Sequence, residues 1–109
     1  MSTAKETKTH RNVGGLIRDY RTAQKGGGKK KSQTEVAMKL GWNNGQYISN
    51  IERGGFGIPS DKLATICEIL NIPKAEMCEA VIADYRLHIQ SSLELTADKF
   101  EEVSEKLAA

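Results

Sequence analysis

The chain has 109 residues and a formal net charge of +2, a length that suits one small domain and excludes a second large core. Residues 1–62 carry 12 Lys and Arg against 5 Asp and Glu, a charge of +7, whereas residues 63–109 carry 4 against 9, a charge of −5. The basic part favours a polyanionic partner, and the low aromatic content of 6% favours helices over sheets.

The first elements are predicted as a basic arm and two helices. Residues 1–11 are polar, carry Lys and Arg, and are expected to form a mobile arm. Apolar residues then follow the i, i+3, i+4, i+7 spacing of a helix over 12–24, which the glycines of 26–28 should end; the stripe is Val13, Leu16, Ile17 and Tyr20. Ser32 and Glu35 form a Ser-x-x-Glu capping box at the start of a second helix that Gly41 should close, with Val36, Ala37 and Leu40 inward.

Four more helices are predicted downstream. A third helix covers 44–53, between the turn residues of "WNNG" and the break at "GGFGIP". Ser60 is expected to cap a fourth helix, which ends near Pro73, with Leu63, Ile66, Cys67 and Leu70 inward. A fifth covers 74–91 with the stripe Cys78, Val81, Ile82, Tyr85 and Ile89. Thr96 should cap a sixth, acidic helix with Phe100, Val103 and Leu107 on one face.

The third predicted helix has an outward face of hydrogen-bonding side chains, because a turn of 100° per residue separates Ile48 and Ile51 from Gln46, Tyr47, Asn50 and Arg53. Gln and Asn can form two hydrogen bonds to adenine in a major groove. Such a face is also compatible with simple solvation, so these residues alone leave both interpretations open.

Glu52 follows Ile48 by four residues and so lies on the inward side of this helix, where an unpaired carboxylate would be costly. Arg21 follows Ile17 by four residues and lies at the edge of the first helix's stripe. We therefore predict a partly buried Arg21–Glu52 ion pair between the first and third helices.

The segment "SQTEVAMKLG" followed by "GQYISNIERG" resembles the Cro/C1-type (XRE-like) helix-turn-helix family of bacterial and phage DNA-binding regulators. The similarity extends from Val13 to Ile82 and includes "VGGLIRDYR" and "LATICEILNIP". It implies an all-α fold, a compact five-helix lambda-repressor-like helix-turn-helix domain over 12–91, with the third helix in the major groove. The fifth helix is long, and residues 92–109 add a C-terminal helical extension.

The resemblance also implies roles for individual residues. Gln46 and Asn50 are expected to contact bases, with Asn44 and Tyr47 as further contacts at the edge, and Ala37 lets the second and third helices pack closely. Gln33 and Arg53 are expected to contact DNA phosphates. Three features depart from the family pattern: Gly45 replaces a larger contact residue, "GGFG" replaces a basic loop, and the first connection is long. Its lysines, Lys29, Lys30 and Lys31, are expected to supply phosphate contacts instead.

Other functional classes have weaker support. The segment "GGGKKKS" is not a nucleotide-binding P-loop, because the Gly-Lys-Ser/Thr order and the preceding strand are missing. His10 and His88 lack the partners of a catalytic or zinc site. We expect no enzyme, no cofactor, no metal and no small-molecule ligand. Without a signal-like or membrane-spanning apolar run, we expect a cytoplasmic protein with two reduced cysteines.

The apolar faces of the last two predicted helices need burial, and their residues are Tyr85, Ile89, Phe100, Val103 and Leu107. They could pack on their own core, bind a protein partner as in an antitoxin or anti-repressor, or form a homodimer contact. We favour the homodimer, because this family commonly reads two-fold operators as dimers. The sequence thus predicts a sequence-specific double-stranded DNA-binding transcriptional regulator, a repressor that binds an inverted repeat as a homodimer through its C-terminal helices.

Overall fold

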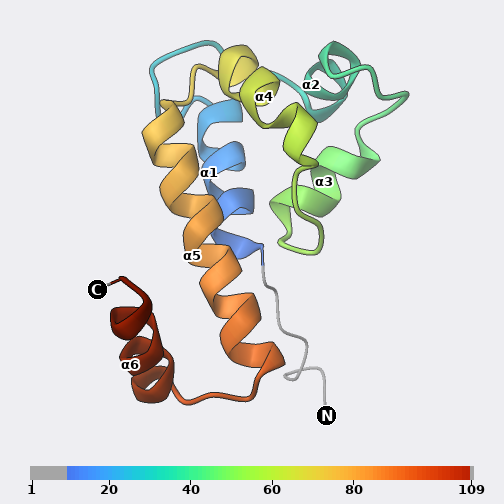
Figure 1. The fold of residues 1–109 in the computed structure, drawn as a ribbon. Coiled ribbons are helices and arrows are strands. Elements are labelled where there is room, and N and C mark those ends of the chain that lie inside the picture. The colour runs from blue at the N-terminus through green and yellow to red at the C-terminus, as the bar shows by residue number, and fades with distance from the viewer. Residues whose placement is uncertain (1–9, 109) are drawn as a thin grey trace.

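The computed structural model describes residues 10–108, and the predicted arm therefore lies almost entirely outside the described residues. The chain is all-α, as predicted, and Figure 1 shows α1 to α5 packed together with α6 beside the far end of α5. The elements are α1 (Arg11–Arg21), α2 (Gln33–Lys39), α3 (Gln46–Glu52), the 3-10 turn η2 (Ser60–Lys62), α4 (Leu63–Leu70), α5 (Lys74–Ser92) and α6 (Ala97–Ala108).

A single hydrophobic core joins the first five helices. The apolar stripes predicted for α1 to α4 supply most of it, and their buried members are Val13, Leu16, Ile17, Val36, Ala37, Leu40, Ile48, Ile51, Ile66, Cys67 and Leu70. Tyr20 and Leu63 are only partly buried and pack against the edge of this cluster. Helices α1 and α3 approach closely at Gly14, where an added Cβ would lie 2.9 Å from the carbonyl oxygen of Glu52.

Two predicted helix ends are wrong. Helix α1 stops at Arg21 rather than Gln24, because Ala23 adopts a left-handed conformation (φ +65°) and the N–H of Gln24 bonds the carbonyl of Asp19. The turn thus precedes the glycines. Ser60 does not cap α4: it begins η2 after Pro59, and α4 follows without a side-chain cap.

The predicted inward stripe of α5 is wrong for most of its residues, although Val81 does pack against the core. Met77 and Asp84 are the buried residues of this helix, whereas Cys78 is exposed and Ile82 and Tyr85 are 50% and 63% exposed. Asp84 is 3% exposed and accepts hydrogen bonds at the start of α1, from the backbone N–H of Asn12 (3.0 Å), its side-chain amide (2.8 Å) and the N–H of Val13 (2.9 Å). The carboxylate therefore caps another helix and occupies the place of an apolar residue.

Helix α6 lies away from α2 and α3 and close to the C-terminal half of α5 (Figure 1). Thr96 caps it as predicted, accepting a hydrogen bond from the N–H of Lys99 (3.1 Å). Arg86 of α5 lies 3.7 Å from Glu101 of α6. Val103 is exposed; the side chains of Phe100 and Leu107, which the predicted stripe includes, lie outside the described part of the chain.

Candidate nucleic-acid interface

Helices α2 and α3 form the candidate interface, and local sequence signals set their ends. Ser32 Oγ accepts a hydrogen bond from the N–H of Glu35 (3.0 Å) at the start of α2. At its end Gly41 takes φ +86°, its N–H bonds the carbonyl of Met38 (3.0 Å), and the N–H of Trp42 bonds the carbonyl of Ala37 (2.9 Å). This pair of bonds is a Schellman motif, which turns the chain sharply toward α3.

A buried polar network holds α3 against α1 and α2. Arg21 Nε and Nη2 donate to the two carboxylate oxygens of Glu52 at 2.5 and 2.9 Å, and these side chains are only 14% and 6% exposed. Gln33 Nε2 donates to Glu52 Oε1 (3.0 Å), and Arg21 Nη1 donates to the carbonyl of Lys31 (3.0 Å). The network therefore fixes the orientation of α3 and the start of α2 together.

The outward side of α3 carries a connected set of side chains, here named the polar row: Gln46, Asn50 and Arg53. Asn50 Oδ1 accepts from Gln46 Nε2 (3.2 Å) and from Arg53 Nη2 (2.6 Å). All these bonds are exposed, so they can be exchanged for contacts with a ligand. Asn44 Oδ1 accepts from the N–H of Gln46 (2.8 Å) and so fixes the first turn of α3.

A family model described as Helix-turn-helix matches residues 28–77, which include all of α2, α3 and α4. The match covers 50 of the 109 residues and supports the resemblance of this region to the Cro/C1-type helix-turn-helix family. The match supports, in general terms, a role as a DNA-binding transcription regulator. Comparisons with curated proteins and with solved structures found nothing that matches the chain. Among the described residues, no helix has both the length and the apolar character needed to cross a membrane.

Gly45 of the helix-turn-helix domain has a steric role that the sequence did not reveal. A Cβ at this position would lie 2.9 Å from the backbone nitrogen of Thr34 and 3.1 Å from the carbonyl carbon of Gln33, both closer than ordinary contact. The glycine therefore allows α3 to begin against the first turn of α2, which explains its departure from the family pattern by packing.

Tyr47 lies on a flank of α3 rather than in the polar row. Its ring stacks on Trp42 with centroids 4.5 Å apart, and it meets the Phe56 ring edge-on at 5.3 Å. Tyr47 and Trp42 are partly buried against the core. A base contact by Tyr47 stays a prediction, and the structure restricts it to the edge of the interface.

The connection between α1 and α2 is anchored at both ends. Lys25 Nζ lies 3.1 Å from Glu76 Oε2 on α5, while the N–H of Lys31 bonds the carbonyl of Arg21 (2.9 Å). Between them Gly26 and Gly27 have φ of +82° and +67°, which glycine adopts without strain. Lys29 and Lys30 are exposed, so this short anchored loop presents positive charge beside the start of α2.

Glu76 also accepts a hydrogen bond from Tyr20 Oη (2.6 Å). The hydrogen bonds from Tyr20 and then Lys25 lower the pKa of the Glu76 carboxyl, and the Glu76 carboxylate in turn raises the pKa of the Tyr20 phenol. The cluster of Tyr20, Lys25 and Glu76 ties the loop to α5.

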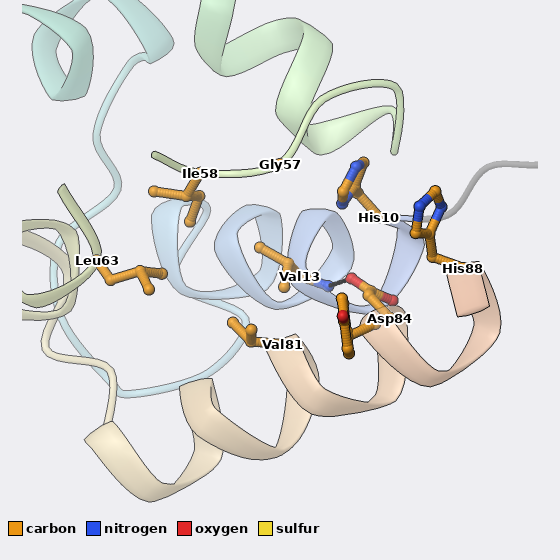
Figure 2. A pocket seen from close by; sticks show the side chains of 9 residues that line it. His10, Val13, Gly57, Ile58, Leu63, Val81, Asp84 and His88 are labelled. Atoms are coloured by element: carbon orange, nitrogen blue, oxygen red, sulfur yellow. Dashed lines mark hydrogen bonds between the residues drawn. The ribbon is translucent and has the colours of Figure 1, made fainter. Parts of the chain in front are cut away.

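A separate pocket of about 220 Å³ lies where the start of α1, the chain after α3, and α5 meet. Figure 2 shows its apolar wall of Val13, Ile58, Leu63 and Val81, with His10, Asp84 and His88 grouped at one end. Both oxygens of Asp84 already accept hydrogen bonds from the start of α1. The polar end of the pocket is therefore part of the α1 cap.

Proposed function

We propose that the protein is a sequence-specific transcriptional regulator that binds double-stranded DNA with α3 in the major groove. The polar row supports the proposal most directly, because exposed Gln46 and Arg53 and half-buried Asn50 form a line along α3. The other side of this helix is fixed by the core and by Glu52. A preorganised row of donors and acceptors suits base edges. Occupying an operator is enough to block transcription, so we assign repression, and we assign the chain no enzymatic step.

Within this proposal, Gln46 and Asn50 read bases through their amides, which can each bond two atoms of adenine. Asn44 and Tyr47 contact the DNA at the edges of this row. Arg53 lies one turn after Asn50 and already donates to it at 2.6 Å, so its guanidinium is oriented toward the same surface and can reach a phosphate.

Other phosphate contacts come from the start of α2 and the loop before it. Gln33 donates one side-chain hydrogen to Glu52 (3.0 Å), which leaves the second amide hydrogen for a phosphate oxygen. Lys29, Lys30 and Lys31 precede this point, and the backbone of Lys31 is held by Arg21. Their positive charges can therefore follow the DNA backbone next to Gln33.

Two sets of variants test these assignments against each other. Gln46→Ala or Asn50→Ala should each cost about 1 to 3 kcal/mol on the selected operator and little on random duplex. The triple change of Lys29, Lys30 and Lys31 to Ala should weaken every duplex and reduce the salt dependence by up to roughly three units. Equal losses on operator and random DNA in the amide variants would contradict base reading, and an unchanged salt slope in the lysine variant would contradict the phosphate contacts.

We further propose that the regulator is a homodimer that binds an inverted repeat. A stripe along α5, here named the α5 seam, runs through Cys78, Ile82, Tyr85, Ile89 and Leu93 at the end of the helix. The spacings of four, three, four and four residues place these side chains on one face. Cys78, Ile82, Tyr85 and Leu93 are exposed, and the face lies about 100° around the helix from Met77 and Asp84. Ile89 is partly buried. An apolar stripe with four exposed residues favours a protein partner.

A second copy fits the α5 seam by its charges as well as its spacing. If two α5 helices pack antiparallel about a two-fold axis, Ile82 of one copy faces Tyr85 of the other and Cys78 faces Ile89. The same arrangement brings Glu79 of each copy near Arg86 of the other. The Arg86 guanidinium also lies 3.7 Å from Glu101 of its own chain, so opposite charges gather on both sides of the axis. An apolar groove of about 280 Å³ between α4 and α5 continues from Cys78 and Ile82 toward Cys67, which extends the contact surface.

Analytical ultracentrifugation tests the dimer. Ile82→Glu should give a monomer, whereas Leu87→Glu should stay dimeric, because Leu87 is also an exposed apolar residue (43%) of α5 but lies off the seam. A chain that ends after Leu93, without α6, should remain dimeric as well. A monomeric wild type would overturn the homodimer and favour the alternative of an antitoxin or anti-repressor whose helices bind another protein.

A further inference from the structure

The polar row has an aromatic neighbour, the ring of Phe56, that the resemblance does not assign to DNA. Trp42 and Tyr47 stack at 4.5 Å with their planes 24° apart, and Phe56 meets Tyr47 edge-on at 5.3 Å with an angle of 64°. The first two rings pack against the core. Phe56 is the outermost of the three and is 45% exposed. The two partly buried rings of Trp42 and Tyr47 therefore support an aromatic ring at the surface.

The loop that carries Phe56 is fixed to the end of α3. The N–H of Gly54 bonds the carbonyl of Ile51 (3.0 Å), and the N–H of Gly55 bonds the carbonyl of Asn50 (3.1 Å). The carbonyl of Gly54 accepts from the N–H of His10 (3.3 Å). Gly54 has φ +86°, a conformation that glycine adopts without strain. The ring is therefore presented at a fixed place, one residue beyond a glycine bonded to Asn50.

This placement brings an apolar surface to the flank of the polar row. By the family resemblance, a basic loop at this position would contact a DNA phosphate. This chain has "GGFG" instead, so Phe56 stands where a basic side chain would be expected. DNA offers apolar partners at such a place: the 5-methyl group of thymine in the major groove and the carbon atoms of deoxyribose along its wall. Burial of the exposed half of the ring on either would be favourable.

We propose that Phe56 is a DNA-contacting residue that packs its ring on the apolar surface of the duplex, at a thymine methyl group or an adjacent deoxyribose. Tyr47 and Trp42 are its positioning residues. The inference rests on the proposed DNA-reading role of α3. The Phe56 contact adds an apolar contribution to DNA affinity that does not decrease with salt, unlike the phosphate contacts of Lys29, Lys30 and Lys31.

The test uses the full chain, the selected operator and the variants Phe56→Ala and Phe56→Leu. Phe56→Ala should weaken operator binding about tenfold and Phe56→Leu less, while the matched surface variant Leu87→Ala should leave it unchanged; circular dichroism confirms that each variant is folded. Thymines are then replaced one at a time by deoxyuracil, which lacks the methyl group. If the ring packs on a methyl, one replacement should cost the wild type about fourfold and cost Phe56→Ala nothing further.

Hydroxyl-radical footprinting covers the other contact. If the ring packs on deoxyribose, Phe56→Ala should lose protection at one or two adjacent sugars while the rest of the footprint persists. If Phe56→Ala lost affinity without a change at one thymine methyl or in the protection of one or two sugars, Phe56 would have a structural role and the proposal would be overturned. Affinity of Phe56→Ala equal to that of Leu87→Ala would also overturn it. If Gln46→Ala still reduced the preference for the operator over random duplex, only the proposed Phe56 contact would have failed. If Gln46→Ala did not change that preference either, the base-reading role of α3 would be contradicted.

Discussion

The cap that Asp84 forms on α1 should make one buried carboxylate important for stability. In Asp84→Asn the shape is nearly unchanged, but one acceptor oxygen becomes an NH2 group and the negative charge is lost. Water can solvate the donors of Asn12, which is exposed, but the N–H of Val13 is buried. Leaving that donor unpaired costs about 1 to 3 kcal/mol, and losing the charge at the helix start costs about 0.3 to 2 kcal/mol. We expect a total loss of about 1 to 5 kcal/mol.

Urea unfolding followed by circular dichroism measures this loss, provided that the slope with denaturant is unchanged. Glu68→Gln is the control, since it removes an exposed carboxylate from the neighbouring helix α4 and should change the free energy of unfolding by less than about 0.5 kcal/mol. If the two variants were equally stable, the three hydrogen bonds to Asp84 would contribute nothing net, and our explanation for the orientation of α5 would be wrong.

Three further predictions concern the helix-turn-helix domain and its loop. Glu52→Ala should cost about 3 to 5 kcal/mol in urea unfolding, because it leaves the Arg21 guanidinium buried without its carboxylate; a loss below about 1 kcal/mol would contradict this. Gly45→Ala should lower the thermal midpoint, since its Cβ would lie 2.9 Å from the backbone of α2, and an unchanged midpoint would show that the helices separate freely. The pKa of Glu76 is lowered in the folded chain, so the ionised carboxylate stabilises the fold above its ordinary pKa of 4.5, and this stabilisation is lost as pH falls through the lowered pKa. Tyr20→Phe removes one of the hydrogen bonds that lower the pKa and should make the loss of stability in acid smaller. An identical dependence of stability on pH in the two proteins would refute the role of the Tyr20–Glu76 bond.

The sequence predicts α1 to α4 well because each of these helices has only one apolar stripe. The place of Glu52 on the inward side of α3 also indicates its partner, since a buried carboxylate needs a positive charge and Arg21 lies at the matching edge of α1. The observed pair joins these two helices directly. Here local pattern and tertiary packing agree, so the pattern alone suffices.

The same periodicity predicts the wrong buried face for α5, because the sequence of this helix has two candidate faces. The stripe with Cys78 and Ile82 is the more apolar, and periodicity selects it. The chain instead buries the face with Met77 and Asp84, because the carboxylate satisfies donors at the start of α1. Those donors belong to a helix about 70 residues earlier, and the pattern within α5 contains no information about them. Gly45 is similar: its reason is the nearby backbone of α2, which only the fold reveals.

The same contacts predict how strictly the proposed dimer should measure the distance between its half-sites. Arg21 and Glu52 fix α3 to α1, and Asp84 fixes α1 to α5, which carries the α5 seam. The two recognition helices of a dimer are therefore joined through packed helices rather than through a flexible linker. One added base pair between the half-sites rotates one of them by about 34° about the duplex axis, which such a dimer cannot follow without losing contacts.

Duplexes with the half-site separation changed by one base pair should therefore bind no more tightly than a single half-site. Adding a full helical turn restores the rotation but moves the half-sites farther apart, so these duplexes should also bind no more tightly than a single half-site. Fluorescence anisotropy with the selected operator measures these affinities. The Asp84→Asn variant provides the internal comparison: if the α1 to α5 contact sets the spacing, this variant should discriminate less between separations at a temperature where it is still folded. Equal affinity of the wild type for all separations would show that the half-sites are read independently, and the α5 seam would then not fix the geometry of the complex.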